Sequence, residues 1–490
     1  MLPLNRTGVV TLLSLLSLFI FAIVAPAQVN KPQPAAEDSA KQPAFVLPSQ
    51  LTRELTEIRD AALSDDYAYR QVAHLTENIG PRAVGSPQAK AAVDFVAAEL
   101  RKLGLEVRLE EVHVPHWMRG VETAELIDYP GQAAGAVQKI VLTALGGTTP
   151  TPPDGITAEV LVVDNFDQLA ALGRQKVVGK IVLFNELFDK QKAAAGLALE
   201  AYGEAVAYRA EGPKRAAELG AIAALVRSVG GADYRLPHTG WSAPAGIPAG
   251  AVTSEDADSI AHLAAQGRVR MHLTLTSENG PEVLSYNVVA DLKGSEHPEQ
   301  VVIVSGHLDS WDLGTGAIDD AAGVAVAMET AELIQRLHLR PTRTLRVIAW
   351  MDEENGGRGH DAYAKAHASE FANYAAVMES DLGAAHPLGF NAKVTASALG
   401  WLKPVQNVLA SLGTNIIKQT GHSPGSDITP MANAGVPALG IMQDSRTYFN
   451  YHHTAADTLD KIAPRELREN AAAMAVMGYA LATLPETLPR

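Results

Sequence analysis

The chain has 490 residues, of which 47% are hydrophobic and 19% charged, and it contains no cysteine. This length exceeds one average domain and the hydrophobic share is enough for a large core, so intrinsic disorder is excluded for most of the chain. Acidic residues outnumber basic ones by 55 to 40, which gives a net charge of −15 and argues against a nucleic acid partner. Without cysteine, any metal must be bound by histidine and carboxylate side chains.

The N-terminal residues have the pattern of an export signal. Arg6 precedes an apolar run over residues 8–24, which ends at the small-residue sequence APA. We therefore expect residues 1–27 to be a cleaved signal peptide and the protein to be secreted or periplasmic, with no stable membrane anchor. The alternative is a membrane anchor, but a run of about 17 residues is at the lower limit for a span. Residues 28–48 are rich in proline, alanine and glutamine and are expected to be a linker.

The next part of the chain predicts a helix, a strand and then an insert. Ser86 is placed to cap a helix that begins at Pro87, and Gly104 lies just past the end of that helix. Alternating polar and apolar residues then predict a strand over 105–114. Short β-rich runs separated by loops rich in glycine and proline follow, and we interpret residues 126–282 as an inserted β-rich domain.

The C-terminal half of the chain alternates between apolar strands and helices. The predicted elements are, in order, 301–305 (strand), 320–337 (helix), 344–351 (strand), 358–370 (helix) and 375–378 (strand). Uninterrupted apolar strands joined by helices are typical of a mostly parallel sheet that helices cover on both faces. The predicted fold class is therefore α/β, with residues 49–125 and 283–490 forming one domain around this central sheet.

Histidine and carboxylate side chains follow each of these three strands. They lie in GHLD (306–309), GAIDD (316–320), DEE (352–354) and ESD (379–381), and YHHTAAD (451–457) supplies further histidines. Parallel sheets bind ligands at the carboxyl ends of their strands, so these side chains are expected at one rim. Carboxylates crowded there repel one another unless a multivalent cation lies among them. Nitrogen and oxygen ligands suit zinc, and the number of carboxylates favours two ions over one.

These motifs resemble those of the co-catalytic di-zinc peptidase family that includes bacterial leucyl aminopeptidases and glutamate carboxypeptidases. The sequences GHLDSWD, GAIDDAAG, DEENGGRG, MESD and HHTAADT match the family in order and spacing, within residues 50–490. The resemblance implies a zinc exopeptidase fold, with an insert that is similar to a protease-associated domain. It also implies two Zn²⁺ ions and hydrolysis of dipeptides or short peptides, as a dipeptidase, carboxypeptidase or aminopeptidase.

The resemblance also assigns roles to individual residues. The implied zinc ligands are His307 and Asp381 on one ion, Glu354 and His453 on the other, and Asp319 between them. Glu353 is implied to be the general base, which accepts a proton as a hydroxide shared by the two zincs attacks the peptide carbonyl. Asp309 is expected to orient the ring of His307 through its second nitrogen.

Four residues have competing interpretations. His452 competes with His453 as a ligand, and we prefer His453 because the family's ligand directly precedes Thr or Ser. Many relatives carry Tyr where this chain has His452, as an oxyanion donor, so the oxyanion donor here stays open. Asp320 could simply cap the following helix, and Asp457 is expected to orient the ring of His453 as Asp309 orients that of His307. Relatives also often have a cis peptide bond after the bridging aspartate.

Two other functions fit parts of the sequence. Residues 421–425 read GHSPG and match the G-x-S-x-G pattern of a serine hydrolase with Ser423 as nucleophile, although no glycine-rich oxyanion loop is found. The second alternative is a receptor-like binding protein that has lost its metals, yet every implied ligand is present. Whether the enzyme recognises the free amine or the free carboxylate of a peptide stays open. Arg358, Lys418 and Arg446 are candidates to bind a substrate carboxylate, only because of their charge and neighbourhood. The insert either narrows the substrate cleft or mediates a homodimer.

Overall fold

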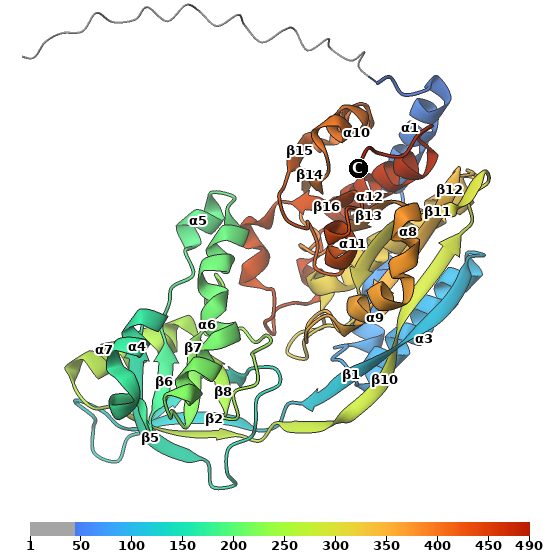
Figure 1. Cartoon of the computed structure of the whole chain (residues 1–490). Helices are drawn as coiled ribbons and strands as arrows, with labels where there is room; N and C mark the ends of the chain where they lie inside the picture. The colour runs from blue at the N-terminus through green and yellow to red at the C-terminus, as the bar shows by residue number, and fades with distance from the viewer. Residues whose placement is uncertain (1–44) are drawn as a thin grey trace, which may run out of the picture. The chain divides into compact units, whose positions relative to one another are not determined.

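The computed structural model describes residues 45–490, and its strands form two eight-stranded sheets (Figure 1). The predicted signal peptide and most of the predicted linker lie outside the described residues. The last residues of that linker do contact the core, since Leu47 is buried and the ring of Phe45 stacks on Trp401. Among residues 45–490 there is no helix with the length and hydropathy needed to cross a membrane.

The first sheet has the strand order β1-β10-β12-β11-β13-β16-β14-β15. Its strands are β1 (Glu106–Met118), β10 (Glu278–Leu292), β11 (His297–His307), β12 (Arg343–Trp350), β13 (Tyr374–Glu379), β14 (Pro387–Lys393), β15 (Ile416–Gln419) and β16 (Ala438–Gln443). The central strands β12, β11, β13 and β16 are parallel, whereas β1 and β10 pair antiparallel with their neighbours. At the other end, β14 is antiparallel to β16 and parallel to β15. The predicted α/β class with a parallel centre is confirmed, and the flanks of the sheet are mixed.

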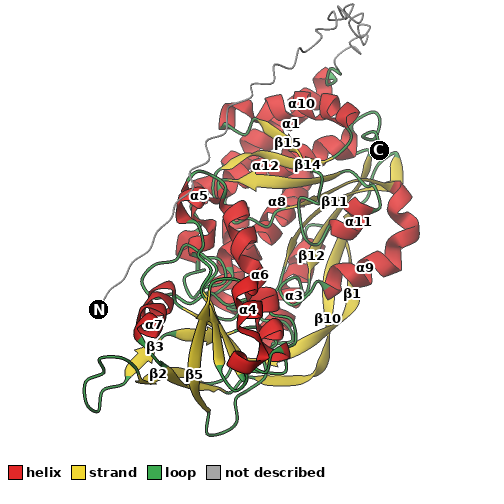
Figure 2. Cartoon of the chain, turned by 60° about the vertical axis from the view of Figure 1, so that its left-hand side comes forward, coloured by secondary structure: helices red, strands yellow, loops and turns green. Residues whose placement is uncertain are grey.

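Helices cover both faces of this sheet (Figure 2). They are α1 (Ser49–Leu63), α2 (Tyr67–Ala73), α3 (Pro87–Lys102), α8 (Ala322–Arg336), α9 (Arg358–His367), α10 (Ala396–Leu409), α11 (Thr429–Asn433) and α12 (Pro464–Thr483). Successive side chains of a strand point to opposite faces. In β11, Val302 and Val304 therefore pack in the core that contains α8 and α12, while Val301 and Ile303 pack with residues of α9 and α11. This explains why the strand is apolar at consecutive positions.

The segment predicted as an insert contains the second sheet, of order β3-β2-β9-β5-β6-β7-β8-β4. Its strands are β2 (Glu122–Asp128), β3 (Gln138–Ile140), β4 (Leu142–Ala144), β5 (Ile156–Val163), β6 (Ile181–Phe184), β7 (Ala223–Arg227), β8 (Ala249–Val252) and β9 (Arg270–Leu275). The segment also has helices that we did not predict, namely α4 (Phe166–Val177), α5 (Lys190–Ala194), α6 (Ala198–Glu218) and α7 (Ser254–Gln266). It is therefore α/β in content, and β2 begins before the predicted boundary at residue 126. The antiparallel pair β1 and β10 connects the two sheets (Figure 1).

Glu329 is a buried carboxylate of α8 whose ionisation should affect stability. Its Oε2 accepts a hydrogen bond of 2.9 Å from the backbone N–H of Ala68, while Oε1 has no partner among the described residues. Burial raises the pKa of Glu329 from 4.5 to about 8; the charges of Asp65 and Glu332 add to this rise, and Arg336 opposes it. The folded state therefore holds this proton more tightly than the unfolded chain, and this contribution to stability is lost as the pH rises from 5 toward 8.

We expect Glu329→Gln to remove this part of the pH dependence, because the amide keeps the acceptor for Ala68 and carries no charge. At pH 8 the variant should exceed the wild type in free energy of unfolding by roughly 2 to 4 kcal/mol, and the gain should shrink toward pH 5. Denaturant unfolding of both proteins across this range measures the difference. Glu57→Gln, at an exposed position of α1, is the control. A difference that does not change with pH would contradict the prediction.

Candidate metal centre

The predicted site residues converge at the carboxyl ends of the central parallel strands. His307 is the last residue of β11, Glu353 and Glu354 follow β12, and Asp381 follows β13. Asp319 lies in the loop that leads into α8, beside the end of β11. His453 reaches the same place from the loop between β16 and α12. Neighbouring parallel strands end at one rim, so motifs that are far apart in the sequence meet there.

The first cluster of possible metal donors consists of His307, Asp319 and Asp381. His307 Nε2 lies 3.2 Å from Asp319 Oδ1 and 3.3 Å from Asp381 Oδ1. Ligand atoms that are about 2.0 Å from a tetrahedral ion lie about 3.3 Å from one another. These two distances fit donors around a zinc ion. Ligand atoms of His307, Asp319 and Glu354 also all lie within 4.8 Å of one another, so this cluster overlaps with the next one.

The second cluster consists of His453, Glu354 and again Asp319. His453 Nε2 lies 3.0 Å from Glu354 Oε2 and 3.3 Å from Asp319 Oδ2. Asp319 thus presents Oδ1 to the first cluster and Oδ2 to the second, so one carboxylate joins them. The other oxygen of Glu354, Oε1, is buried without a partner among the described residues. The peptide bond between Asp319 and Asp320 is cis, as the resemblance implies.

Backbone carbonyls determine which nitrogen of the two histidines carries a proton. His307 Nδ1 lies 3.0 Å from the carbonyl oxygen of Asp309, and His453 Nδ1 lies 3.3 Å from that of Thr239. Because a carbonyl only accepts hydrogen bonds, we assign the proton to Nδ1 in both rings. Nε2 of a neutral ring then has a free lone pair, and these Nε2 atoms are the ones that face the carboxylates. Both rings are thus prepared to bind a metal.

The buried carboxylates of the site need nearby positive charge to stay ionised. Burial raises the pKa of Glu354 to about 8, and the charge of Asp319 adds to this rise while His453 opposes it. Burial likewise raises the pKa of Asp381 to about 6, with Glu353 and Asp319 acting in the same direction. Bound divalent cations would lower these pKa values and keep the ligands ionised. The donor set of histidine and carboxylate therefore fits zinc in chemistry, spacing and charge.

Asp309 differs from its predicted role. Its carboxylate accepts hydrogen bonds from the backbone N–H groups of residues 352, 353 and 354, at 2.8, 3.2 and 3.2 Å. Its Oδ1 lies 3.8 Å from His307 Nδ1, whereas the Asp309 carbonyl oxygen is closer, at 3.0 Å. The backbone of Asp309 therefore orients the His307 ring, and the side chain holds the loop that carries Glu353 and Glu354.

Asp320 and Asp457 also hold backbone in place. Asp320 accepts hydrogen bonds from the N–H groups of His307 (3.0 Å) and Gly323 (2.9 Å). It therefore binds an N–H group in the first turn of α8, although the N-cap position itself is Ala321. Asp457 Oδ1 accepts hydrogen bonds of 2.8 Å from both N–H groups of residues 317 and 318. It therefore supports the loop of the shared aspartate, and the expectation that it orients His453 is corrected.

Two residues of the site were missed because no motif contains them. Arg82 is fully buried and donates to the carbonyl oxygens of Leu308 (2.7 Å), Thr315 (2.8 Å) and Gly316 (2.8 Å), which fixes the loop after β11. Tyr448 donates its hydroxyl to Asp319 Oδ1 at 3.2 Å. Each comes from a segment far from the motif that it supports, so only the folded chain reveals the contact.

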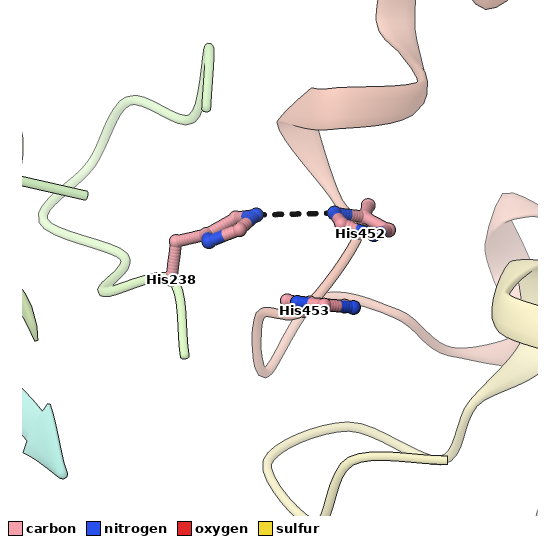
Figure 3. A group of neighbouring side chains, drawn as sticks. All are labelled: His238, His452 and His453. Carbon is pink, nitrogen blue, oxygen red and sulfur yellow. Dashed lines mark hydrogen bonds between the residues drawn. The ribbon is translucent and has the colours of Figure 1, made fainter. Parts of the chain in front are cut away.

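Figure 3 shows how His238, from the second-sheet segment, approaches the two histidines of the HHT motif. His238 Nε2 and His452 Nδ1 lie 3.1 Å apart, and the rings of His452 and His453 stack with centroids 3.5 Å apart. His452 Nε2 lies 3.6 Å from Asp319 Oδ2, against 3.3 Å for His453. The preference for His453 as the metal-facing histidine therefore agrees with the geometry.

A cavity of about 900 Å³ opens onto the two clusters. Its walls include Asp319, Glu353, Glu354, Asp381, His452, His453, Lys418 and Ser423, together with Tyr202, Arg209 and Trp241 of the second-sheet segment. Within residues 45–490 the carboxylate of Glu353 has no hydrogen bond or ion pair with another residue. Of the predicted carboxylate partners, Arg358 pairs with Glu282 and Arg446 pairs with Asp444. Only Lys418 of those three lines the cavity.

Ser423 does not form the arrangement that a serine hydrolase needs. Its hydroxyl donates to the carbonyl oxygen of Gly425 at 2.8 Å. His453 Nε2 faces Glu354 and Asp319 instead, and no histidine of the described chain bonds to Ser423. The nucleophile and base of the serine hydrolase alternative are therefore not connected.

Comparison with known proteins identifies the family of this chain. Residues 287–477 match the model of peptidase family M28. Carboxypeptidase Q of Bos taurus is 38% identical over 429 residues, which cover 86% of this chain and 87% of that protein. The crystal structure of a peptidase M28 precursor from Shewanella amazonensis is 35% identical, with a TM-score of 0.84 over 90% of this chain and 98% of the other. A zinc aminopeptidase of Bacillus subtilis shares the fold, at 21% identity and a TM-score of 0.62 over 86% of this chain and 96% of the other. The chain therefore belongs to peptidase family M28 and is a metallopeptidase.

Proposed function

We propose that this peptidase is a di-zinc exopeptidase that hydrolyses dipeptides or short peptides. The proposed ligands are His307, Asp319, Glu354, Asp381 and His453. The observation that carries the proposal is the Asp319 carboxylate, whose Oδ1 lies 3.2 Å from His307 Nε2 and whose Oδ2 lies 3.3 Å from His453 Nε2. Zinc ions held there would lower the pKa of water to about 7 and polarise the peptide carbonyl.

Glu353 is the proposed general base. It lies next to the proposed ligand Glu354, lines the cavity, and has a carboxylate without a hydrogen bond or ion pair among the described residues. The backbone N–H of Glu353 donates to Asp309 at 3.2 Å, which holds its loop in place. We propose that Glu353 takes the proton of the attacking water and returns it to the leaving amine nitrogen.

The cavity favours small substrates. Its volume of about 900 Å³ is within the range of about 300 to 1,000 Å³ typical of small-molecule sites. Tyr202, Arg209 and Trp241 of the second-sheet segment form part of its wall, so this segment, a protease-associated-like insert in our proposal, would keep folded proteins out. The names of the relatives include both carboxypeptidases and aminopeptidases, which is consistent with an exopeptidase. Export and a homodimer stay predictions from the sequence.

Metal removal tests the proposal. A chelator should lower the hydrolysis of L-alanyl-L-alanine at least about 100-fold, and two equivalents of zinc should restore it, because the metals supply both water activation and carbonyl polarisation. Ser423→Ala should retain most of the activity. Chelator-resistant hydrolysis that Ser423→Ala abolishes would establish the serine hydrolase instead. A zinc-loaded protein that cleaves no dipeptide or short peptide would favour the receptor alternative.

A further inference from the structure

Two asparagines of the chain directly precede a glycine, namely Asn279 and Asn355. An asparagine in this setting is chemically labile, because the backbone nitrogen of the next residue can attack the side-chain amide and glycine has no side chain that hinders the approach. Asn355 directly follows the proposed ligand Glu354 and lies two positions after the proposed base Glu353. A change in the backbone at Asn355 would therefore act on the loop of the metal centre.

The surroundings of Asn355 leave this attack unhindered. Residues 353–356 form a turn, and the Asn355 side chain is partly exposed and has no hydrogen bond among the described residues. Gly356 is exposed at a φ of +123°, and apart from its chain neighbours no atom lies within 4 Å of the place where a Cβ would be. Its N–H group, which must give up its proton for the attack, donates one long hydrogen bond of 3.3 Å to the carbonyl oxygen of Glu353. Both the attacking nitrogen and the side-chain amide are thus weakly restrained.

The second asparagine is held in place by its surroundings. Asn279 belongs to β10, where it pairs with Trp117 of β1, and Gly280 pairs with His116. The amide nitrogen Nδ2 of Asn279 donates a hydrogen bond of 3.2 Å to the carbonyl oxygen of Thr148. The sheet pairing restrains the backbone and this hydrogen bond restrains the side chain, so a ring can close between them only if both are broken. The same dipeptide thus provides an internal control.

We propose that Asn355 is a site of spontaneous deamidation to isoaspartate, and that this modification inactivates the enzyme. The backbone nitrogen of Gly356 bonds to Cγ of Asn355 while the Cγ–Nδ2 bond breaks, and the proton of that nitrogen leaves with Nδ2 as ammonia. Water then opens the resulting succinimide ring. Attack of water at the main-chain carbonyl carbon breaks its bond to the nitrogen of Gly356, so this carbon becomes a free carboxylate and the chain continues through Cβ and Cγ of an isoaspartate. Attack at Cγ instead leaves an ordinary aspartate.

The isoaspartate acts on the metal centre through the backbone. It lengthens the main chain directly after Glu354 by one C–C bond of about 1.5 Å. The loop is fixed on both sides of this point, because the N–H groups of residues 352–354 donate to the Asp309 carboxylate and the N–H group of Gly357 donates to the carbonyl oxygen of Asp352 at 2.7 Å. A displacement of about 1 Å at a catalytic site can lower the rate about 100-fold, so the modified molecules should be almost inactive. The effect on hydrolysis rests on the proposed function, whereas the modification itself does not.

The test follows the zinc-loaded protein during incubation at mildly alkaline pH. Peptide mapping by mass spectrometry, combined with isoaspartyl methyltransferase labelling, locates and quantifies isoaspartate, and hydrolysis of L-alanyl-L-alanine is measured on the same samples. We expect isoaspartate at Asn355 and not at Asn279, with activity falling in proportion to the modified fraction. Asn355→Gln should keep its own starting activity, because the corresponding ring closes far more slowly for glutamine. Asn355→Asp adds the charge without lengthening the chain and should be more active than the isoaspartate form.

Several outcomes would overturn the proposal. An Asn355 that stays intact, or that deamidates more slowly than Asn279, excludes the modification site. Full activity of protein that carries isoaspartate at this position excludes the inactivation, as does an Asn355→Gln protein that loses activity at the wild-type rate. An Asn355→Asp protein as inactive as the isoaspartate form would assign the loss to charge and not to the backbone. If Asn355→Gln does not fold, the wild-type time course and the comparison with Asn279 decide. If the fresh protein cleaves no peptide, the proposed function fails, and the isoaspartate content still tests the modification.

Discussion

Replacing Glu353 by Gln is expected to lower peptide hydrolysis by about 10²- to 10⁴-fold while zinc binding is retained. The amide has the size of the carboxylate but cannot accept the proton of the attacking water. The side chain of Glu353 has no partner among the described residues, and its backbone hydrogen bond to Asp309 does not depend on the side chain. The measurement is kcat on L-alanyl-L-alanine together with zinc content by elemental analysis.

The neighbouring glutamate provides a matched comparison for this experiment. Glu354→Gln changes the same functional group one residue later, at a position 3.0 Å from His453 Nε2, and should lower zinc content as well as activity. Glu282→Gln, at an exposed position, should change neither. Full activity of Glu353→Gln would overturn its assignment as the base. Loss of zinc from Glu353→Gln would show that Glu353 is a ligand.

The meeting of the site residues could be predicted because each motif is recognisable within a short stretch of sequence. Each motif follows an apolar strand, and parallel strands end together, so the sequence alone predicts that His307 and Asp381 lie close to each other. The resemblance then implied a role for each residue, and these roles stay predictions. The fold class and the position of the site at the rim of the sheet could therefore be predicted, because both depend on patterns within short stretches of sequence.

The contacts that the sequence could not predict are long-range or involve the backbone. Nothing local distinguishes the carbonyl oxygen of Asp309 from its carboxylate as the partner of His307. Arg209 and His453 are separated by 244 positions, and neither motif nor charge pattern connects them. The helices of the insert were missed for a related reason: α4 contains Gly173 with non-helical backbone angles, and α6 contains Pro213. Tertiary packing stabilises helices whose local propensity is weak.

Replacing Asp319 by Asn should remove the feature that joins the two clusters. The variant keeps one oxygen but exchanges the other for an NH₂ group, which donates hydrogen bonds and cannot bind a cation. The zinc content should therefore fall from two ions per chain toward one or none. Mutating a residue that only supports a ligand already costs about 10- to 100-fold, so loss of the shared ligand should lower activity by at least about 100-fold.

The stability of the Asp319→Asn protein provides a readout that is independent of catalysis. Ligands that bind the folded state raise its unfolding temperature, so zinc should stabilise the wild type strongly and Asp319→Asn much less. Asp381→Asn is the matched control, since Asp381 contacts His307 in the first cluster only. It should lose one ion and retain the other. If Asp319→Asn bound two zinc ions as tightly as the wild type, the carboxylate would not be shared between them. The two clusters would then have to be independent metal sites, and a hydrolytic mechanism that needs both ions together would lose its structural basis.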